Sequence, residues 1–202
     1  MIGKDPVFLL SVYDPDKIPP PLHTREVALL GTSNVGKSSL LSEIANKNNL
    51  ARASKTPGKT RCINFFHIPP EIIIADIPGF GFSKAPKAVS GSWQELVETY
   101  LRNRGRSLMA YLLIDGRRGI RPLDIDVMVL LAENNVGCKL VFTKIDKLNV
   151  VEKESLAGHC SQAICGLGRP LIEMGKPFMT SAKNSIGIQE LRKDMLNWGR
   201  TC

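Results

Sequence analysis

The sequence contains one loop whose residue types and spacing are suited to binding phosphate. Gly31-Thr32-Ser33-Asn34-Val35-Gly36-Lys37-Ser38 matches the pattern G-x-x-x-x-G-K-S/T. The glycines let the backbone turn tightly enough for successive N–H groups to point at a β-phosphate, and the start of the following helix adds a partial positive charge. Lys37 can bridge β- and γ-phosphate oxygens, and the Ser38 hydroxyl can ligate Mg²⁺. We therefore predict a nucleotide site formed by this loop and the adjacent Ser39.

Two later segments are suited to recognising a guanine base. Thr143-Lys144-Ile145-Asp146 and Ser181-Ala182-Lys183 each follow an apolar, strand-like run. The Asp146 carboxylate offers two acceptor oxygens that match the ring N–H and amino group of guanine, whereas adenine would leave the carboxylate unpaired. The stem of Lys144 can cover the base, and the Ala182 N–H can donate to the guanine carbonyl. Either segment alone could be an exposed turn, but together with the phosphate loop they predict GTP and GDP as ligands.

A D-x-x-G segment between Asp76 and Gly79 is suited to sensing the γ-phosphate. Asp76 can hold Mg²⁺ through a water molecule, and the Gly79 N–H can bond the γ-phosphate. In the preceding polar loop, Gly58 and Thr60 are predicted nucleotide contacts, and Thr60 is predicted to ligate Mg²⁺, with Thr56 as the alternative. Loops that hold a γ-phosphate and relax after hydrolysis make a nucleotide-dependent switch.

The residues predicted to act in hydrolysis are Lys37, Thr60 and Gly79, because they place charge and a donor around the γ-phosphate. In many switch GTPases, a glutamine directly after the D-x-x-G glycine orients the attacking water. Here that position is Phe80, whose side chain has no donor or acceptor. We therefore predict a GTPase with slow intrinsic hydrolysis. Charge of the arginine-finger kind, supplied by a partner, would raise such a rate by roughly 10³–10⁵.

These segments need a scaffold in which strands and helices alternate, and the apolar patterns show that alternation. The predicted fold is α/β, a three-layer P-loop NTPase fold with a mostly parallel six-stranded sheet and helices on both faces. Residues 1–24 are predicted to form an extended, proline-marked arm, and residues 25–202 one GTP-binding domain. The predicted strands are Arg25–Leu30, Cys62–Ile68, Glu71–Ile77, Leu108–Ile114, Gly137–Thr143 and Pro177–Ser181. The predicted helices are Lys37–Lys47, Ser92–Arg104, Leu123–Asn134, Val150–Leu167 and Ile186–Trp198.

Composition limits the partners and the compartment. The net charge of +8 favours a polyanionic partner, RNA or ribonucleoprotein first, with a solvated basic face or an anionic membrane as alternatives. No stretch is long and apolar enough to cross a bilayer, and the five cysteines show no metal-ligand spacing. We predict an intracellular protein, cytoplasmic in a bacterium, and mitochondrial or otherwise organellar in a eukaryote.

From about Asp14 to Trp198 the sequence resembles the EngB family of GTP-binding proteins, within the Era-related class. The resemblance implies a small monomeric GTPase that acts in assembly of the large ribosomal subunit and contacts ribosomal RNA and large-subunit particles, with no DNA or membrane partner. The family usually has an arginine where this chain has Thr32. Besides the phosphate loop through Leu40 and the Thr143–Asp146 segment, the resemblance rests on Ser54–Thr60, Asn64–Phe66, Asp76–Gly81 and Asp115–Gly119.

The resemblance also implies that Asn34 helps to hold K⁺ against the phosphates, and the alternative is that Asn34 only stabilises the loop. A second functional hypothesis is a nucleotide-dependent placeholder on a ribosomal particle with negligible hydrolysis, and a third is a membrane-linked signalling switch. The basic residues expected in or near an RNA contact are Arg52, Lys55, Lys59, Arg61, Lys84, Lys87, Arg102, Arg104, Arg106, Arg117, Arg118 and Arg121.

Overall fold

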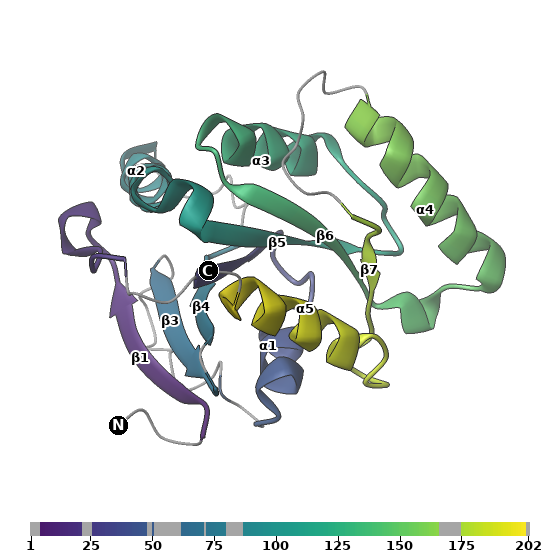
Figure 1. The fold of residues 1–202 in the computed structure, drawn as a ribbon. Helices are drawn as coiled ribbons and strands as arrows, with labels where there is room; N and C mark the ends of the chain where they lie inside the picture. The colour runs from purple at the N-terminus through teal and green to yellow at the C-terminus, as the bar shows by residue number, and fades with distance from the viewer. Residues whose placement is uncertain are drawn as a thin grey trace.

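A computed structural model describes residues 5–21, 26–47, 50, 62–70, 72–79, 87–165 and 175–200. Within these residues, seven strands form one sheet in the order β1-β3-β4-β2-β5-β6-β7, with helices on both faces (Figure 1). The strands are β1 (Val7–Val12), β2 (Glu26–Gly31), β3 (Ile63–Ile68), β4 (Ile72–Asp76), β5 (Leu108–Asp115), β6 (Gly137–Thr143) and β7 (Phe178–Met179).

The centre of the sheet is parallel, and one edge is antiparallel. β4, β2, β5, β6 and β7 run in the same direction, and β3 runs antiparallel to β4. Every residue of β2 and β5 is buried, as expected for strands of a parallel sheet covered on both faces. β3 and β4 form an antiparallel hairpin, with Pro69 and Pro70 at its turn. The predicted α/β architecture is therefore confirmed.

The prediction of six strands is wrong, because the N-terminal segment adds a seventh. β1 pairs antiparallel with β3 and forms the edge of the sheet. Its pairing shifts between Phe8 and Leu10, and the ring of Phe8 packs edge-on against Phe66 at a centroid distance of 5.7 Å. The irregularity breaks the simple alternation of buried and exposed residues, and the partner strand lies more than fifty residues away. Both features hide the strand from a local pattern.

Helices enclose the sheet in two apolar cores. α1 and α5 pack against one face, where Leu41, Leu191 and Met195 are fully buried. α2 and α3 cover the other face, where Leu96 and Met128 are fully buried, and Figure 1 shows the two layers. α2 begins five residues before the predicted Ser92. The helices are α1 (Lys37–Ala45), α2 (Lys87–Arg104), α3 (Pro122–Glu133), α4 (Val150–Cys165) and α5 (Ile188–Arg200).

A buried ion pair fastens α2 to β2 and to the segment between β1 and β2. Arg104 Nε donates to Glu26 Oε2 over 2.9 Å, and the Tyr100 hydroxyl donates to the same oxygen over 2.9 Å. A second Arg104 nitrogen donates to the carbonyl of Pro19 over 2.8 Å. The Arg104 side chain is 1% exposed. Burial, and then the neighbouring Glu26 carboxylate, raise the pKa of Tyr100, so its hydroxyl stays a donor.

Candidate nucleotide-binding site

The phosphate loop joins the carboxyl end of β2 to the start of α1 (Figure 1). Gly36 precedes α1 with φ = +106°, a backbone conformation that favours glycine. A Cβ atom on Gly31 would lie 2.8 Å from the carbonyl oxygen of Leu113 in the neighbouring strand, so a larger residue does not fit there. The loop thus places the first N–H groups of α1 at the carboxyl ends of the parallel strands, and the start of a helix attracts anions.

The predicted phosphate-binding lysine and the predicted Mg²⁺-binding aspartate meet at the carboxyl ends of these strands. Lys37 Nζ donates to Asp76 Oδ1, and the two side chains are 13% and 10% exposed. Asp76 ends β4, directly beside Leu29 of β2. Because both side chains are largely shielded from water, this contact orders the lysine and the carboxylate relative to each other.

Gly79 packs directly against the phosphate loop. A Cβ atom on Gly79 would lie 2.9 Å from Ser33 Oγ and 3.0 Å from the Ser33 nitrogen. Any larger residue would therefore push the D-x-x-G segment away from the loop. This contact brings together two segments that the sequence separates by more than forty residues.

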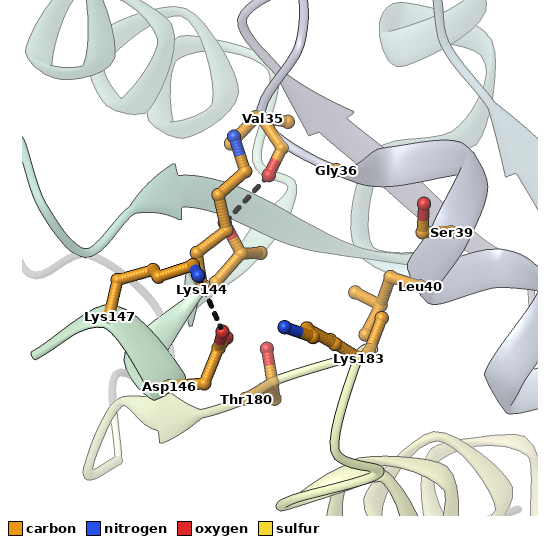
Figure 2. Close-up of a pocket in the computed structure, with 11 residues that line it drawn as sticks. Val35, Gly36, Ser39, Leu40, Lys144, Asp146, Lys147, Thr180 and Lys183 are labelled. Atoms are coloured by element: carbon orange, nitrogen blue, oxygen red, sulfur yellow. Dashed lines mark hydrogen bonds and ion pairs between the residues drawn. The ribbon is translucent and has the colours of Figure 1, made fainter.

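A cavity of about 210 Å³ lies beside the phosphate loop. Four segments line it: the loop, the first turn of α1, the residues after β6 and the residues after β7 (Figure 2). Predicted phosphate-loop and base-binding residues thus share one pocket, and Leu40, Lys147 and Thr180 complete its wall. The predicted contacts that line it are Val35, Gly36, Ser39, Thr143, Lys144, Asp146, Ala182 and Lys183.

The carboxylate of Asp146 is held in a fixed orientation inside this pocket. Ser181 Oγ donates to Asp146 Oδ1 over 2.7 Å, and the Asn184 N–H donates to the same hydroxyl over 3.2 Å. The bond from Ser181 lowers the pKa of Asp146, with smaller contributions from Lys147 and Lys183. The sequence placed Ser181 in the site but did not reveal that it orients the carboxylate.

Thr143 and Lys144 tie the residues after β6 to the phosphate loop. Thr143 Oγ1 donates to the carbonyl of Val35 over 2.7 Å, and Lys144 Nζ donates to the carbonyl of Asn34 over 2.6 Å. Lys144 has φ = 59°, so its backbone turns sharply and its side chain runs back over the loop. The base-binding and phosphate-binding segments therefore form one connected unit.

Sequence reasoning gave no role to Asp115, which lies at the carboxyl end of β5. It accepts hydrogen bonds from Arg117 Nε at 2.9 Å, from Arg117 Nη2 at 2.7 Å and from Lys144 Nζ at 2.9 Å. These bonds, those from Arg117 above all, hold the pKa of Asp115 far below its usual range despite burial. The signal available in the sequence was its place directly after the apolar run Leu108–Ile114, in the Asp115–Gly119 segment on which the family resemblance rests.

The remaining predicted site residues divide by exposure and by whether the structure describes them. Gly58, Thr60 and the alternative Thr56 lie outside the described residues, as does Phe80. Thr32, Ser33 and Ala182 are half-buried, whereas Asn34, Ser38, Ser39 and Lys183 are exposed. The exposed hydroxyl and amide groups at the loop and at the first turn of α1 are accessible to a ligand.

A phosphate loop, a D-x-x-G segment and a guanine-binding segment that meet at the carboxyl ends of parallel strands define a P-loop GTPase. Residues 26–144 match the family described as "50S ribosome-binding GTPase". With the relatives described next, this match shows that the chain belongs to the EngB family of GTP-binding proteins. Within the described residues, no helix combines the length and the apolar character needed to span a membrane.

Both the sequence and the fold have close counterparts. The probable GTP-binding protein EngB of Cereibacter sphaeroides is 38% identical over 173 residues, which cover 86% of this chain and 78% of the relative. The crystal structure of a probable GTP-binding protein EngB gives a TM-score of 0.68 at 26% identity, covering 87% of this chain and 98% of that one. The structure of Era in complex with MgGDPNP and nucleotides 1506–1542 of 16S ribosomal RNA gives a TM-score of 0.63 at 25% identity. The match covers 88% of this chain and 57% of the Era chain.

Proposed function

We propose that this protein hydrolyses GTP slowly and uses the bound nucleotide to control its association with large-subunit ribosomal particles during their assembly. The observation that carries the nucleotide part is the oriented Asp146 carboxylate in a pocket beside the phosphate loop. The ribosomal part is supported by the family description, by the rRNA complex of the structural neighbour Era and by the net charge of +8. The protein acts as a monomer, in the bacterial cytoplasm or in a mitochondrion or other organelle.

In the proposed complex, the guanine base occupies the cavity of about 210 Å³. Asp146 accepts two hydrogen bonds from the base, the Ala182 N–H donates to its carbonyl, and the stem of Lys144 lies along its face. Thr143 and Lys183 also line the cavity, and Ser181 orients the Asp146 carboxylate. The phosphates follow the loop from Gly31 to Ser39, where the start of α1 faces them.

The residues present fit a Mg²⁺ ion. Ser38 is exposed at the start of α1, and Asp76 is a shielded carboxylate whose partner Lys37 has a second role on the phosphates. Ser38 and Thr60 would ligate the ion directly and Asp76 through water, and all three offer the oxygen ligands that Mg²⁺ prefers. When bound, the ion neutralises charge on the β- and γ-phosphates.

Slow hydrolysis follows from the groups around the γ-phosphate. Lys37 and Thr60 supply charge and coordination, and the Gly79 N–H supplies a donor. Phe80, however, has no group that could orient the attacking water. Asn34, exposed on the phosphate loop, is the proposed K⁺ ligand that partly offsets this lack. A rate that is equal in K⁺ and Na⁺ buffers would contradict the role of Asn34.

The described basic residues that the sequence groups at an RNA contact include a buried arginine as well as exposed ones. Arg104, which the sequence groups with the basic RNA-contact residues, is buried against Glu26 and is not available to RNA. Arg102 and Arg106 line a polar groove of about 510 Å³ between the ends of α2 and α3. Together with the exposed Arg118 and Arg121 of the β5–α3 connection, they are the proposed phosphate contacts. The side chain of Lys87 and all of Arg52, Lys55, Lys59, Arg61 and Lys84 lie outside the described part of the chain.

The test is sedimentation with large-subunit particles in the presence of GTP, GDP or a non-hydrolysable GTP analogue. We expect stronger association with the two triphosphates and weaker association as salt rises. The matched control is Asp146→Asn. The amide can donate a hydrogen bond where the carboxylate could only accept one, so xanthosine nucleotides, which carry a carbonyl in place of the guanine amino group, should control association in this variant. Association indifferent to the nucleotide in both proteins would contradict the switch. If GTP binds and turns over negligibly even with particles and K⁺, the protein is instead a placeholder.

A further inference from the structure

Asp115 is a buried carboxylate at the carboxyl end of β5, on the side of the sheet where the nucleotide motifs meet. Its side chain is 7% exposed, and it accepts hydrogen bonds from two cationic side chains. Oδ1 accepts from Arg117 Nε and from the Arg117 backbone N–H. Oδ2 accepts from Arg117 Nη2 and from Lys144 Nζ. Arg117 therefore fixes the plane of the carboxylate, and the oxygen shared by the two cations points at Lys144.

Lys144 is in turn fixed at its charged end. Its Nζ atom bonds Asn34 on one side and Asp115 on the other, at 2.6 and 2.9 Å. Its Cε atom would lie 3.8 Å from a Cβ atom placed on Gly36, so the stem runs beside the phosphate loop in ordinary van der Waals contact. The same side chain lines the cavity that contains Asp146.

We infer that Asp115 is a positioning residue for guanine nucleotides: it holds the Lys144 side chain along the pocket, and Arg117 holds Asp115 in the orientation that reaches Lys144. The inference rests on the proposed nucleotide pose. A lysine has many rotamers, and fixing one before a ligand binds removes that ordering cost from the binding step. Without Asp115, the remaining partner of Lys144 Nζ among the described residues is the neutral carbonyl of Asn34.

The experiment measures GDP affinity by calorimetry for wild type, Asp115→Asn and Arg117→Ala. Asp115→Asn keeps the shape but loses the charge, and we expect the dissociation constant to rise about tenfold, on the scale of one weakened charge-assisted hydrogen bond. Arg117→Ala leaves the bond between Asp115 and Lys144 in place, so its loss should be smaller. A matched control should leave GDP affinity unchanged: Asp124→Asn, which removes the charge of another buried aspartate, on α3.

A double-mutant cycle separates positioning from a merely structural role. In a Lys144→Met background, Asp115→Asn should have no further effect on GDP affinity, because the residue it acts through is gone. A general distortion of the strand end would weaken binding equally in both backgrounds, and that result would overturn the inference. An unchanged dissociation constant in Asp115→Asn would overturn it too. Failure of wild type to prefer guanosine nucleotides would contradict the proposed function instead, so the two failures are distinguishable.

Discussion

The hydroxyl of Ser181 donates to the carboxylate of Asp146 over 2.7 Å, and this bond joins the residues after β7 to the residues after β6. Ser181 is 1% exposed and forms an isolated bridge with Ile186, so its position is set by the backbone. The proposed base-reading carboxylate is therefore oriented from a neighbouring segment, and its geometry depends on a residue outside its own motif.

Ser181→Ala should weaken guanosine nucleotide binding while leaving the fold intact. A hydrogen bond to a charged group contributes about 1.5–3 kcal/mol, so the dissociation constant for GDP should rise roughly tenfold or more. Calorimetric titration with GDP measures the change. Ser185→Ala removes an exposed serine in the same loop, whose hydroxyl bonds Glu43, and serves as the control. Equal affinities for the two variants would show that the orientation of Asp146 does not depend on Ser181.

Asp76→Asn should reduce the gain in GTP affinity that Mg²⁺ provides. In EDTA the variant should bind GTP at least as tightly as wild type, because Lys37 no longer has to leave an anionic partner to reach the phosphates. Titrations with and without Mg²⁺ give the comparison. Asp194→Asn alters another lysine–aspartate pair, with Lys139 at 2.8 Å, and should behave like wild type. A Mg²⁺ effect of wild-type size in Asp76→Asn would rule out this role.

Arg104→Met should destabilise the fold strongly, because it leaves the buried carboxylate of Glu26 with Tyr100 as its remaining described partner. Removing one member of a buried ion pair costs about 3–5 kcal/mol of unfolding free energy. Adding Glu26→Gln should restore part of this loss, since the stranded charge is then gone. Urea unfolding monitored by circular dichroism measures both variants. If Arg104→Met alone were as stable as wild type, the ion pair would not be important for stability.

Asp115 should make the unfolding free energy depend on pH in acid. Its pKa is lowered in the folded protein, so its ionised form stabilises the fold above the ordinary aspartate pKa of about 3.9, and the contribution is lost as pH falls below that value. The difference between wild type and Asp115→Asn should therefore be constant from about pH 7 to 5 and shrink below about pH 4. Urea unfolding at several pH values tests this. A difference that grows in acid would have the wrong sign.

The local pattern of apolar and polar residues was sufficient to predict the central strands of the sheet but not its edge strand β1. β2, β5 and β6 are largely apolar runs next to chemically distinctive residues, so their type and their approximate ends could be predicted. β1 could not, because its six largely apolar residues show no regular alternation of buried and exposed positions, and its pairing with β3 is irregular. The carboxyl ends of these strands could be predicted because the apolar residues stop where the polar site residues begin.

In the site, motifs identified the residues that face the ligand but not those that hold them. Asp146 and Lys144 are recognisable because their chemistry matches guanine. Asp115 and Arg117 act through Lys144, and only the pairing of β5 with β6 brings them to it. Likewise, nothing in the sequence distinguishes the buried Arg104 from its exposed neighbours Arg102 and Arg106. Such distinctions depend on tertiary contacts between segments far apart in the chain.

The bond from Arg104 to the Pro19 carbonyl has a practical meaning for anyone shortening this protein. A fragment starting at residue 25 would contain every nucleotide motif but would lack β1. Its β3 would then be an exposed edge strand, whose unpaired backbone N–H and C=O groups could pair with another chain. It would also carry an arginine whose guanidinium had lost one acceptor. Aggregation of such a fragment would therefore result from the missing N-terminal strand and not from a defect in the GTP-binding site.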